Sequence, residues 1–273
     1  MVEVVVEEIL KGKHTSVIFI GDTDTGKTTL WRLTAEALIS RGHTIGLVDS
    51  DIGQASLFLP ATVSAKVVSS TEVLDSRDVD FIYFVGLFNP ALSLENHIRA
   101  AKRAFEFAKK RAPIVLLDTT GLVRGRYGQK LKLEKIRQLD ISLVVALQRQ
   151  DELEHIISHV PEERLLLLKP SPLVRQRPRT ERISYRRNLF RQYFRDLYLH
   201  QVPFNKVRFL YSFTPRTQKG LLCGLVSEGQ TIGLGIVEDY AKGALEVLSP
   251  VGLEERIDRY LVGGVFLEEE VYI

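Results

Sequence analysis

Cysteine is nearly absent from the chain. Only Cys223 occurs among 273 residues, so no disulfide can form within the chain. Small domains stapled by disulfides are therefore excluded, and we expect a reducing, cytoplasmic setting. Because Cys223 lies in the apolar run LLCGLV, we expect a buried side chain and not a reactive thiol.

Long apolar runs are also missing. No stretch approaches the roughly 20 apolar residues that a membrane-spanning helix needs. The first ten residues, MVEVVVEEIL, are too few for a secretory signal peptide and carry three glutamates. We therefore expect no membrane partner. The formal net charge of +3 permits a polyanionic partner without requiring one.

The first two thirds of the chain alternate short apolar runs with amphipathic ones. Runs typical of buried strands occupy 17–20, 44–48, 81–85, 114–117, 143–147 and 165–168, and helical spacing is found over 28–40, 94–110 and 131–138. Continuous apolar strands separated by helices indicate a mainly parallel sheet with helices on both faces. The expected fold class is a doubly wound α/β fold.

The texture changes near Pro203. An amphipathic helix is predicted over 186–199, and short strand-like runs follow at 207–213, 221–226, 231–237, 244–248 and 261–267. This pattern predicts a small C-terminal β domain. We expect domains at 1–202 and 203–273, with an arginine-rich lid at about 172–195 in the first.

The stretch GDTDTGKT satisfies the phosphate-binding pattern G-x-x-x-x-G-K-[ST]. The apolar run SVIFI precedes it and a helical pattern follows, as in the fold of P-loop NTPases. Glycines let backbone N–H groups turn toward phosphates, and the helix N-terminus adds a favourable dipole. Lys27 is predicted to reach the β- and γ-phosphates and Thr28 to hold Mg²⁺. The predicted nucleotide-binding residues are Gly21, Asp22, Thr23, Asp24, Thr25, Gly26, Lys27, Thr28 and Thr29.

Two acids follow the second predicted strand, in LVDSDIGQ. Asp49 and Asp51 are two residues apart, so in an extended strand both side chains point the same way. A carboxylate beside a magnesium–nucleotide complex can hold a metal-bound water or take the proton of an attacking hydroxyl. The alternative is a solvated loop with two surface acids.

The run IVLLDTTGLVRG makes Asp118 a Walker B candidate near magnesium. Its DTTG also resembles the D-x-x-G of GTPases. However, LQRQDE stands where a GTPase carries its guanine-specifying N-K-x-D, and it lacks both the Asn and the Lys. Asp22 stands where partitioning ATPases carry a second lysine. Both of these alternatives are therefore disfavoured.

The segment VRQRPRTERISYRR holds six arginines and one acid, Glu181. On a merely solvated helix, acids would intersperse as partners of the bases, although a solvated basic face remains the alternative. Guanidinium groups suit bidentate contact with phosphate. Such a segment could close over the transferring γ-phosphate or grip a nucleic-acid backbone.

Four stretches in this order, GDTDTGKTT, DSDIGQ, DTTGLVRG and the arginine segment running into FRQYF, resemble the polynucleotide 5′-hydroxyl kinases. That family includes the kinase subunit of the pre-mRNA cleavage complex and the nucleolar kinase of ribosomal RNA processing. The tail GQTIGLGIVEDYAKGALEVLSPV resembles the family's C-terminal β domain. The resemblance spans roughly residues 16–250.

The resemblance implies transfer of the γ-phosphate of ATP or GTP, with Mg²⁺, to the 5′-hydroxyl of RNA or DNA. It implies Asp51 as general base, Lys27 as phosphate ligand, and Arg177 and Arg182 as lid arginines. The metal ligands are expected to be Thr28, Asp49 and Asp118. Substrate contacts are expected from Gln54, Thr119, Thr120, Gly121, Arg124, Arg175 and Arg179.

Two departures from the family pattern matter. Leu122 stands where eukaryotic members often carry a tryptophan after the clasp glycine, so backbone contacts must carry more of the grip on the acceptor. Only about fifteen residues precede the P-loop strand, so we expect a minimal, prokaryotic form. The rival functions are a nucleotide-hydrolysing switch, an RNA-binding assembly subunit without kinase activity, and a small-molecule kinase. Protein partners are left open.

Overall fold

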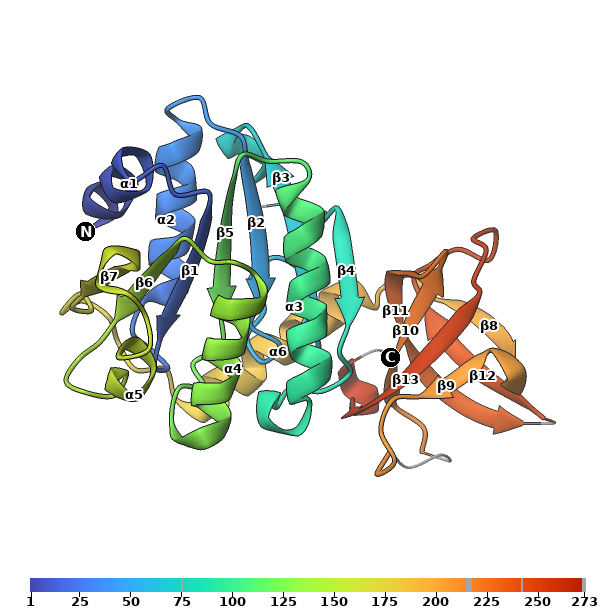
Figure 1. The fold of residues 1–273 in the computed structure, drawn as a ribbon. Helices are drawn as coiled ribbons and strands as arrows, with labels where there is room; N and C mark the ends of the chain where they lie inside the picture. The colour runs from blue at the N-terminus through green and yellow to red at the C-terminus, as the bar shows by residue number, and fades with distance from the viewer. Residues whose placement is uncertain (75, 215–217, 242, 272–273) are drawn as a thin grey trace.

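The computed structural model describes residues 1–74, 76–214, 218–241 and 243–271. A sheet with strand order β7-β6-β1-β5-β2-β3-β4 forms the centre of the first domain, and a β domain follows beside β4 (Figure 1). The strands of the first domain are β1 (Ser16–Gly21), β2 (Ile45–Ser50), β3 (Thr62–Val68), β4 (Phe81–Phe84), β5 (Ile114–Thr119), β6 (Leu143–Leu147) and β7 (Leu165–Leu168).

The central strands are parallel and buried along their whole length. β1 pairs in parallel with β5 and β6, and β2 pairs in parallel with β5. Aliphatic residues fill these strands because helices cover both faces, which confirms the predicted doubly wound α/β fold. The register places Asp49 opposite Asp118, so the chemistry-bearing ends of β2 and β5 meet at one edge.

Strand β3 is absent from the sequence-based prediction. It runs antiparallel to both β2 and β4. The segment TVSAKVV was missed because Ser64 and Lys66 interrupt its apolar run, yet both side chains are buried. The sheet is therefore mainly parallel with one antiparallel strand inserted.

Helices cover the sheet on two sides, as Figure 1 shows. On one face lie α1 (Val2–Lys11) and α2 (Lys27–Ile39), and on the other lie α3 (Leu94–Lys109), α4 (Gly125–Gln138) and α5 (Glu154–Ile157). The helices predicted at 28–40 and 94–110 are confirmed, whereas α4 begins six residues before the predicted 131. None of the helices in the described part of the chain has the length and apolarity that a bilayer crossing demands.

The arginine segment folds differently from the prediction. Helix α6 spans Arg179–Tyr193, whereas the predicted helix covered 186–199. Pro178 stands directly before its first turn, where a fixed φ near −60° suits a helix start. Strand β8 (Tyr198–Pro203) follows because its alternating residues pair with β12 (Ala244–Ser249).

The β domain contains β8, β9 (Val207–Phe209), β10 (Leu221–Ser227), β11 (Gln230–Ala241), β12 and β13 (Arg259–Phe266). Cys223 is fully buried in its core, as predicted, and burial raises the pKa of its thiol. A boundary at 203 would separate β8 from its partner β12, so β8 groups structurally with the β domain. Thr231 of β11 pairs with Ile82 of β4, which joins the two sheets.

Candidate active site

The P-loop connects β1 to α2 at the carboxyl edge of the sheet. Asp24 and Gly26 adopt positive φ angles of 54° and 85°, which turn the backbone around the loop. Gly21 must be a glycine because an added Cβ would lie 2.7 Å from Thr25 Oγ1 and 2.8 Å from the Leu147 carbonyl oxygen. The loop therefore has the tight curvature and open N–H groups that cradle phosphate.

Lys27 opens helix α2 and reaches back into the loop. Its side chain is 6% exposed, and Nζ donates a hydrogen bond to the Asp22 carbonyl oxygen at 2.8 Å. Burial lowers the pKa of Lys27, while the carboxylates of Asp118 and Asp51 oppose that shift. A buried ammonium group within a backbone loop is positioned to meet an anion.

Thr28 and Asp118 form the candidate metal position. The Thr28 hydroxyl donates to Asp118 Oδ2 at 2.6 Å, and the Thr119 N–H donates to Oδ1 at 2.9 Å. Burial, and next the carboxylate of Asp49, raise the pKa of Asp118 to about 7. A cation beside this carboxyl would favour its ionised form, and hydroxyl and carboxylate oxygens are ligands that Mg²⁺ accepts together with water. The residues present therefore fit a magnesium ion.

The Asp49 carboxylate stabilises the loop after β2 and does not line the cleft. Its carboxylate is 1% exposed and accepts four hydrogen bonds, from the N–H groups of Asp51, Ser56 and Leu57 and from the Ser56 hydroxyl, at 2.6–3.1 Å. Burial raises its pKa, while these backbone donors act against the shift. Both of its carboxylate oxygens are thus engaged by the loop after β2, while the strand register keeps Asp49 opposite Asp118. Because β2 ends at Ser50, Asp51 lies beyond the strand and the two acids face different surroundings.

Asp51 lines the cleft with one oxygen held and the other open. Its Oδ1 accepts hydrogen bonds from the N–H groups of Gly53 and Gln54, both at 3.0 Å. Its Oδ2 accepts no hydrogen bond from any residue that the structure describes. The loop therefore orients the carboxylate and leaves one oxygen available to an incoming hydroxyl.

Gln54 also lines the cleft, and its amide is incompletely satisfied. Its Nε2 donates to the Gly53 carbonyl oxygen at 2.8 Å, but its buried Oε1 has no hydrogen-bond partner. An unpaired buried acceptor is costly, so a ligand donor at this point would stabilise the site.

The clasp, residues 120–124, packs directly on the P-loop. An added Cβ at Gly121 would lie 2.4 Å from Thr23 Oγ1, so only glycine allows this approach. Thr120, Gly121 and Arg124 line the cleft, and Arg124 pairs with Asp22 at 3.0 Å. Thr119 does not reach the cleft. Its hydroxyl is buried and donates to the Phe19 carbonyl oxygen at 2.8 Å, so the predicted substrate contact by this side chain is wrong.

The arginine segment closes on the P-loop through Asp24. Arg182 Nη2 lies 2.6 Å from Asp24 Oδ2, and Arg177 donates its backbone N–H to the same oxygen at 3.1 Å. Both arginines line the cleft. Arg175 instead pairs with Glu181 at 2.7 Å outside the cleft, and Arg179 is exposed and does not line it. Of the arginines in this segment that the structure describes, Arg177 and Arg182 are therefore the two that line the cleft.

Several residues near the cleft were missed by the sequence-based prediction. Phe88, Pro90, Ser56 and Tyr185 line it. The Arg186 guanidinium lies 5.0 Å from the centre of the Phe88 ring, and burial together with Arg179 lowers the Arg186 pKa.

Two lysines of α4, Lys132 and Lys135, are completely buried behind the site. Lys132 Nζ donates to the Thr120 carbonyl oxygen at 2.6 Å, and Lys135 Nζ donates to the Ser50 hydroxyl at 2.8 Å. Burial lowers the pKa of Lys132 and brings that of Lys135 to about 7. No sequence motif predicts that Lys132 and Lys135 are buried, because in the sequence they resemble the solvent-facing lysines of an amphipathic helix.

The assembled cleft has a volume of about 500 Å³. The P-loop with Lys27 and Thr28, the Asp51 loop with Gln54, and the clasp all line it, and Asp118 lies directly behind Thr28. A phosphate donor bound at Lys27 and an acceptor hydroxyl next to the Asp51 carboxylate could thus meet within this cleft.

Comparison with known proteins adds an independent line of evidence. Residues 21–196 match the family model described as mRNA cleavage and polyadenylation factor CLP1 P-loop. A polyribonucleotide 5′-hydroxyl-kinase of Pyrococcus horikoshii is 38% identical, with 67% of this chain and 51% of that protein covered. One of Methanocaldococcus jannaschii is 26% identical, with 89% and 84% covered. This chain therefore spans about half the length of the Pyrococcus relatives that it matches.

A solved structure of Clp1p in complex with Pcf11p shares the fold. The TM-score is 0.76 at 12% identity, with 96% of this chain and 77% of that one covered. The region matched by the family model, residues 21–196, contains the P-loop, the Asp51 loop, the clasp and helix α6. The chain belongs to the CLP1 P-loop family.

Proposed function

We propose that the protein is a polynucleotide 5′-hydroxyl kinase that transfers the γ-phosphate of a purine nucleoside triphosphate to the 5′-hydroxyl of RNA. The observation that carries this proposal is the free Oδ2 of Asp51 in the cleft that also contains Lys27, Arg177 and Arg182. An RNA acceptor is supported by the printed names of the archaeal relatives, which are polyribonucleotide 5′-hydroxyl-kinases.

The proposed reaction is a direct, in-line transfer. The 5′-oxygen of the acceptor forms a bond to the γ-phosphorus, the bond from that phosphorus to the β–γ bridging oxygen breaks, and the nucleoside diphosphate leaves. Asp51 takes the proton of the hydroxyl at Oδ2. Lys27 neutralises the β- and γ-phosphates, and Arg182 stabilises the charge on the transferring group. Binding of phosphate at the loop would compete with Asp24 for Arg177 and Arg182.

Magnesium would be held by Thr28 and Asp118, whose oxygens already face each other. When bound, it would supply charge neutralisation to the donor phosphates. The surrounding residues hold the Asp118 carboxylate in position. Asp118 is held by the Thr119 N–H, and Ser50 donates to the Asp118 carbonyl oxygen at 2.7 Å, which fixes the end of β5 against β2.

A second groove beside the P-loop is the proposed binding site for the purine base of the donor nucleotide. It has a volume of about 900 Å³ and shares Asp24, Thr25, Gly26, Thr28 and Thr29 of the P-loop with the cleft. Apolar side chains line it, namely Val2, Leu30, Leu33, Leu147, Leu173 and Val174. A purine base can bury its faces in such surroundings, so we place the base here, on the far side of the P-loop from Asp51.

The deciding experiment uses magnesium, γ-labelled ATP and a short RNA with a free 5′-hydroxyl. The same RNA with a 5′-phosphate is the control acceptor. We expect label on the hydroxyl RNA alone, and a decrease in kcat of about 10²–10⁴-fold for Asp51→Asn, because the general base is lost while the size of the side chain is kept. Label released only as free phosphate, at a rate indifferent to RNA, would establish a hydrolysing switch instead.

A further inference from the structure

A second polar cavity lies away from the cleft, between the P-loop domain and the β domain. It has a volume of about 500 Å³. One wall comes from β4 and α3, and the other comes from β9, β13 and the turn between β10 and β11, which face each other in Figure 1. Four arginines line it, two from each wall: Arg99, Arg103, Arg208 and Arg259. We call this cavity the arginine groove.

The arginines of the groove are not neutralised by the protein. All four are exposed, and no acid of the described residues lies within ion-pair distance of any of them. Asp258 is the one acid among the described residues that lines the groove. Its carboxylate already accepts hydrogen bonds from the Glu228 N–H at 2.8 Å and from Arg256 Nε at 3.2 Å, and these donors lower its pKa. The groove therefore carries a clear excess of positive charge.

Aromatic side chains accompany the arginines. The Arg103 guanidinium lies 5.9 Å from the centre of the Tyr83 ring, and the Tyr83 hydroxyl donates to Asn96 Oδ1 at 3.1 Å. Beside the groove, Tyr211, whose hydroxyl lies 3.4 Å from Nδ2 of the lining residue Asn96, stacks on Phe213, whose side chain is 56% exposed. Arginine with exposed aromatic rings is the combination that binds single-stranded nucleic acid without sequence preference.

The groove is continuous with the cleft along the chain. β4 forms a groove wall, and the residues that follow it, including Phe88 and Pro90, line the cleft. Helix α3 then begins at Leu94 and carries Arg99 five residues later, about 8 Å along the helix axis. His97 of the same helix lies 2.8 Å from the Ser50 carbonyl oxygen, directly before Asp51, so the start of α3 is anchored at the acceptor end of the cleft and Arg99 follows two residues later.

We propose that the arginine groove binds the sugar–phosphate backbone of the acceptor, several nucleotides downstream of its 5′ end. This inference rests on the proposed function, because it assumes an acceptor chain that begins in the cleft. The guanidinium groups contact phosphates, and the exposed Phe213 ring stacks on a base. An acidic protein segment would suit the charge but would make no use of the exposed Phe213 ring.

The test combines Arg99→Gln, Arg103→Gln, Arg208→Gln and Arg259→Gln in one variant. For a 5′-hydroxyl RNA of about 20 nucleotides, we expect KM to rise roughly tenfold or more, and the dependence of log affinity on log salt to become less steep by about 3, since each phosphate contact contributes about 0.7. KM for ATP, and for a dinucleotide acceptor, should stay unchanged because neither extends from the cleft into the groove.

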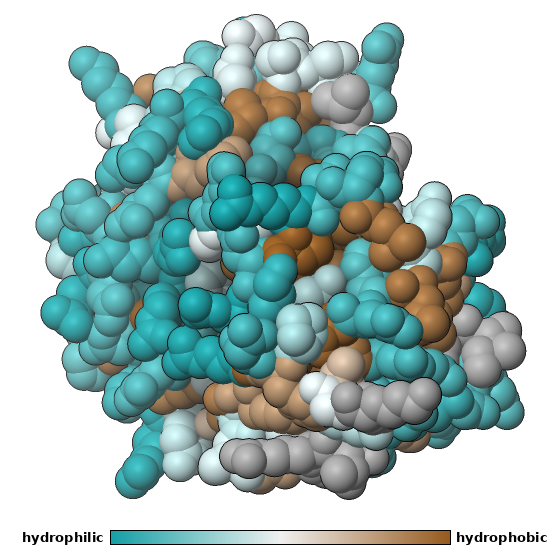
Figure 2. All heavy atoms as spheres, turned by 90° about the vertical axis from the view of Figure 1, so that its right-hand side faces the viewer, coloured by the Kyte–Doolittle hydropathy of each residue, from teal (hydrophilic) through white to brown (hydrophobic). Residues whose placement is uncertain are grey.

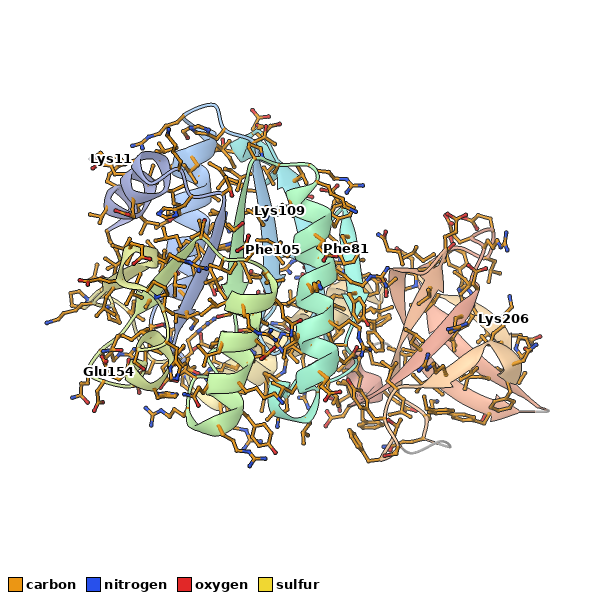
Figure 3. All side chains as sticks on the ribbon, viewed as in Figure 1. Lys11, Phe81, Phe105, Lys109, Glu154 and Lys206 are labelled. Carbon is orange, nitrogen blue, oxygen red and sulfur yellow. The ribbon has the colours of Figure 1, made fainter. Side chains whose placement is uncertain are left out.

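A matched control removes four charges from the opposite edge of the sheet. Lys13, Arg41, Lys109 and Lys110 are exposed and lie where strands begin, and all four are changed to Gln. Figure 3 labels Lys109 at the far end of α3 and Phe81 in the groove wall. The control should keep the KM and salt dependence of the unmodified protein for the long RNA.

Binding measured without turnover separates the two proposals. Fluorescence anisotropy of a 3′-labelled RNA of about 20 nucleotides reports on the groove even if no phosphate is transferred. If the unmodified protein transfers no label to either RNA, the proposed function fails. If the groove variant binds and phosphorylates the long RNA like the control variant, the arginine groove is not an acceptor site, and a protein partner becomes the better occupant.

Discussion

The two domains bury different kinds of side chain. Within the described chain, every buried lysine and aspartate belongs to the P-loop domain, and most of them meet at the carboxyl edge of the sheet: Lys27, Asp49, Asp118, Lys132 and Lys135. The core of the β domain is instead built from apolar residues such as Leu225, Val247 and Val262. Its outer surface is largely hydrophilic, with separate apolar patches (Figure 2).

Burying charge is costly, and burying aliphatic side chains stabilises a fold. The charges at the carboxyl edge are therefore kept for what they do to phosphates and for how they place the loops around them. The β domain contributes stability and a wall for helix α6, where the Tyr193 hydroxyl accepts a hydrogen bond from the Leu234 N–H at 2.8 Å. Substitutions in the two regions should consequently separate activity from stability.

Of the substitutions that compare the two domains, Lys27→Met should have the largest effect on activity, without loss of stability. The variant removes a buried ammonium group of lowered pKa and keeps most of the side-chain volume. We expect kcat/KM to fall by about 10²–10³-fold, because the phosphates lose their main cationic partner. Denaturant unfolding should give an equal or higher free energy of unfolding. A clear loss of stability would contradict the comparison between the two domains.

The opposite result is expected for Leu225→Ala in the β domain. Leu225 is fully buried in that domain's own core, among the apolar side chains of its cluster. The substitution should lower the free energy of unfolding by about 2–5 kcal/mol through lost burial and a cavity. At a temperature where the variant is folded, kcat should stay within a few-fold of the original value. A matched surface change, Leu253→Ala, should leave both quantities unchanged, because Leu253 is exposed.

The sequence predicted the parts of the site that depend on local chemistry. The P-loop and Asp118 belong to short motifs whose spacing already implies their geometry, and in the structure Asp118 accepts a hydrogen bond from Thr28 of the P-loop. The strand count failed where a polar residue such as Lys66 is buried in β3. The helix was predicted too far toward the C-terminus because Leu197 and Leu199 continue the apolar pattern. In the structure, residues 198–203 instead form strand β8, which pairs with β12.

Long-range packing accounts for what the motifs could not predict. Asp49 and Asp51 have the same residue type and neighbouring positions, but the loop after β2 turns back and supplies four donors to Asp49. The buried lysines Lys132 and Lys135 depend on α4 packing against the ends of β2 and β5. The four arginines of the groove come from separate parts of the chain and form one surface only in the fold.

The smallest expected effect, a pH dependence, tests whether the edge charges are truly costly. Lys135 has a pKa of about 7 in the folded protein, against 10.5 as its ordinary value. Between these two values the unfolded chain binds the proton that the folded chain lacks, so stability should rise with pH across this window and be flat below it. Relative to Lys135→Met, the unmodified protein should gain on the order of 1 kcal/mol per pH unit above pH 7. Urea unfolding of both proteins measures this difference, and Lys130→Met, an exposed lysine of the same helix, should show no such slope. A constant difference between Lys135→Met and the unmodified protein would mean that Lys135 stays protonated beside Ser50, and that the carboxyl edge of the sheet tolerates buried charge at little cost.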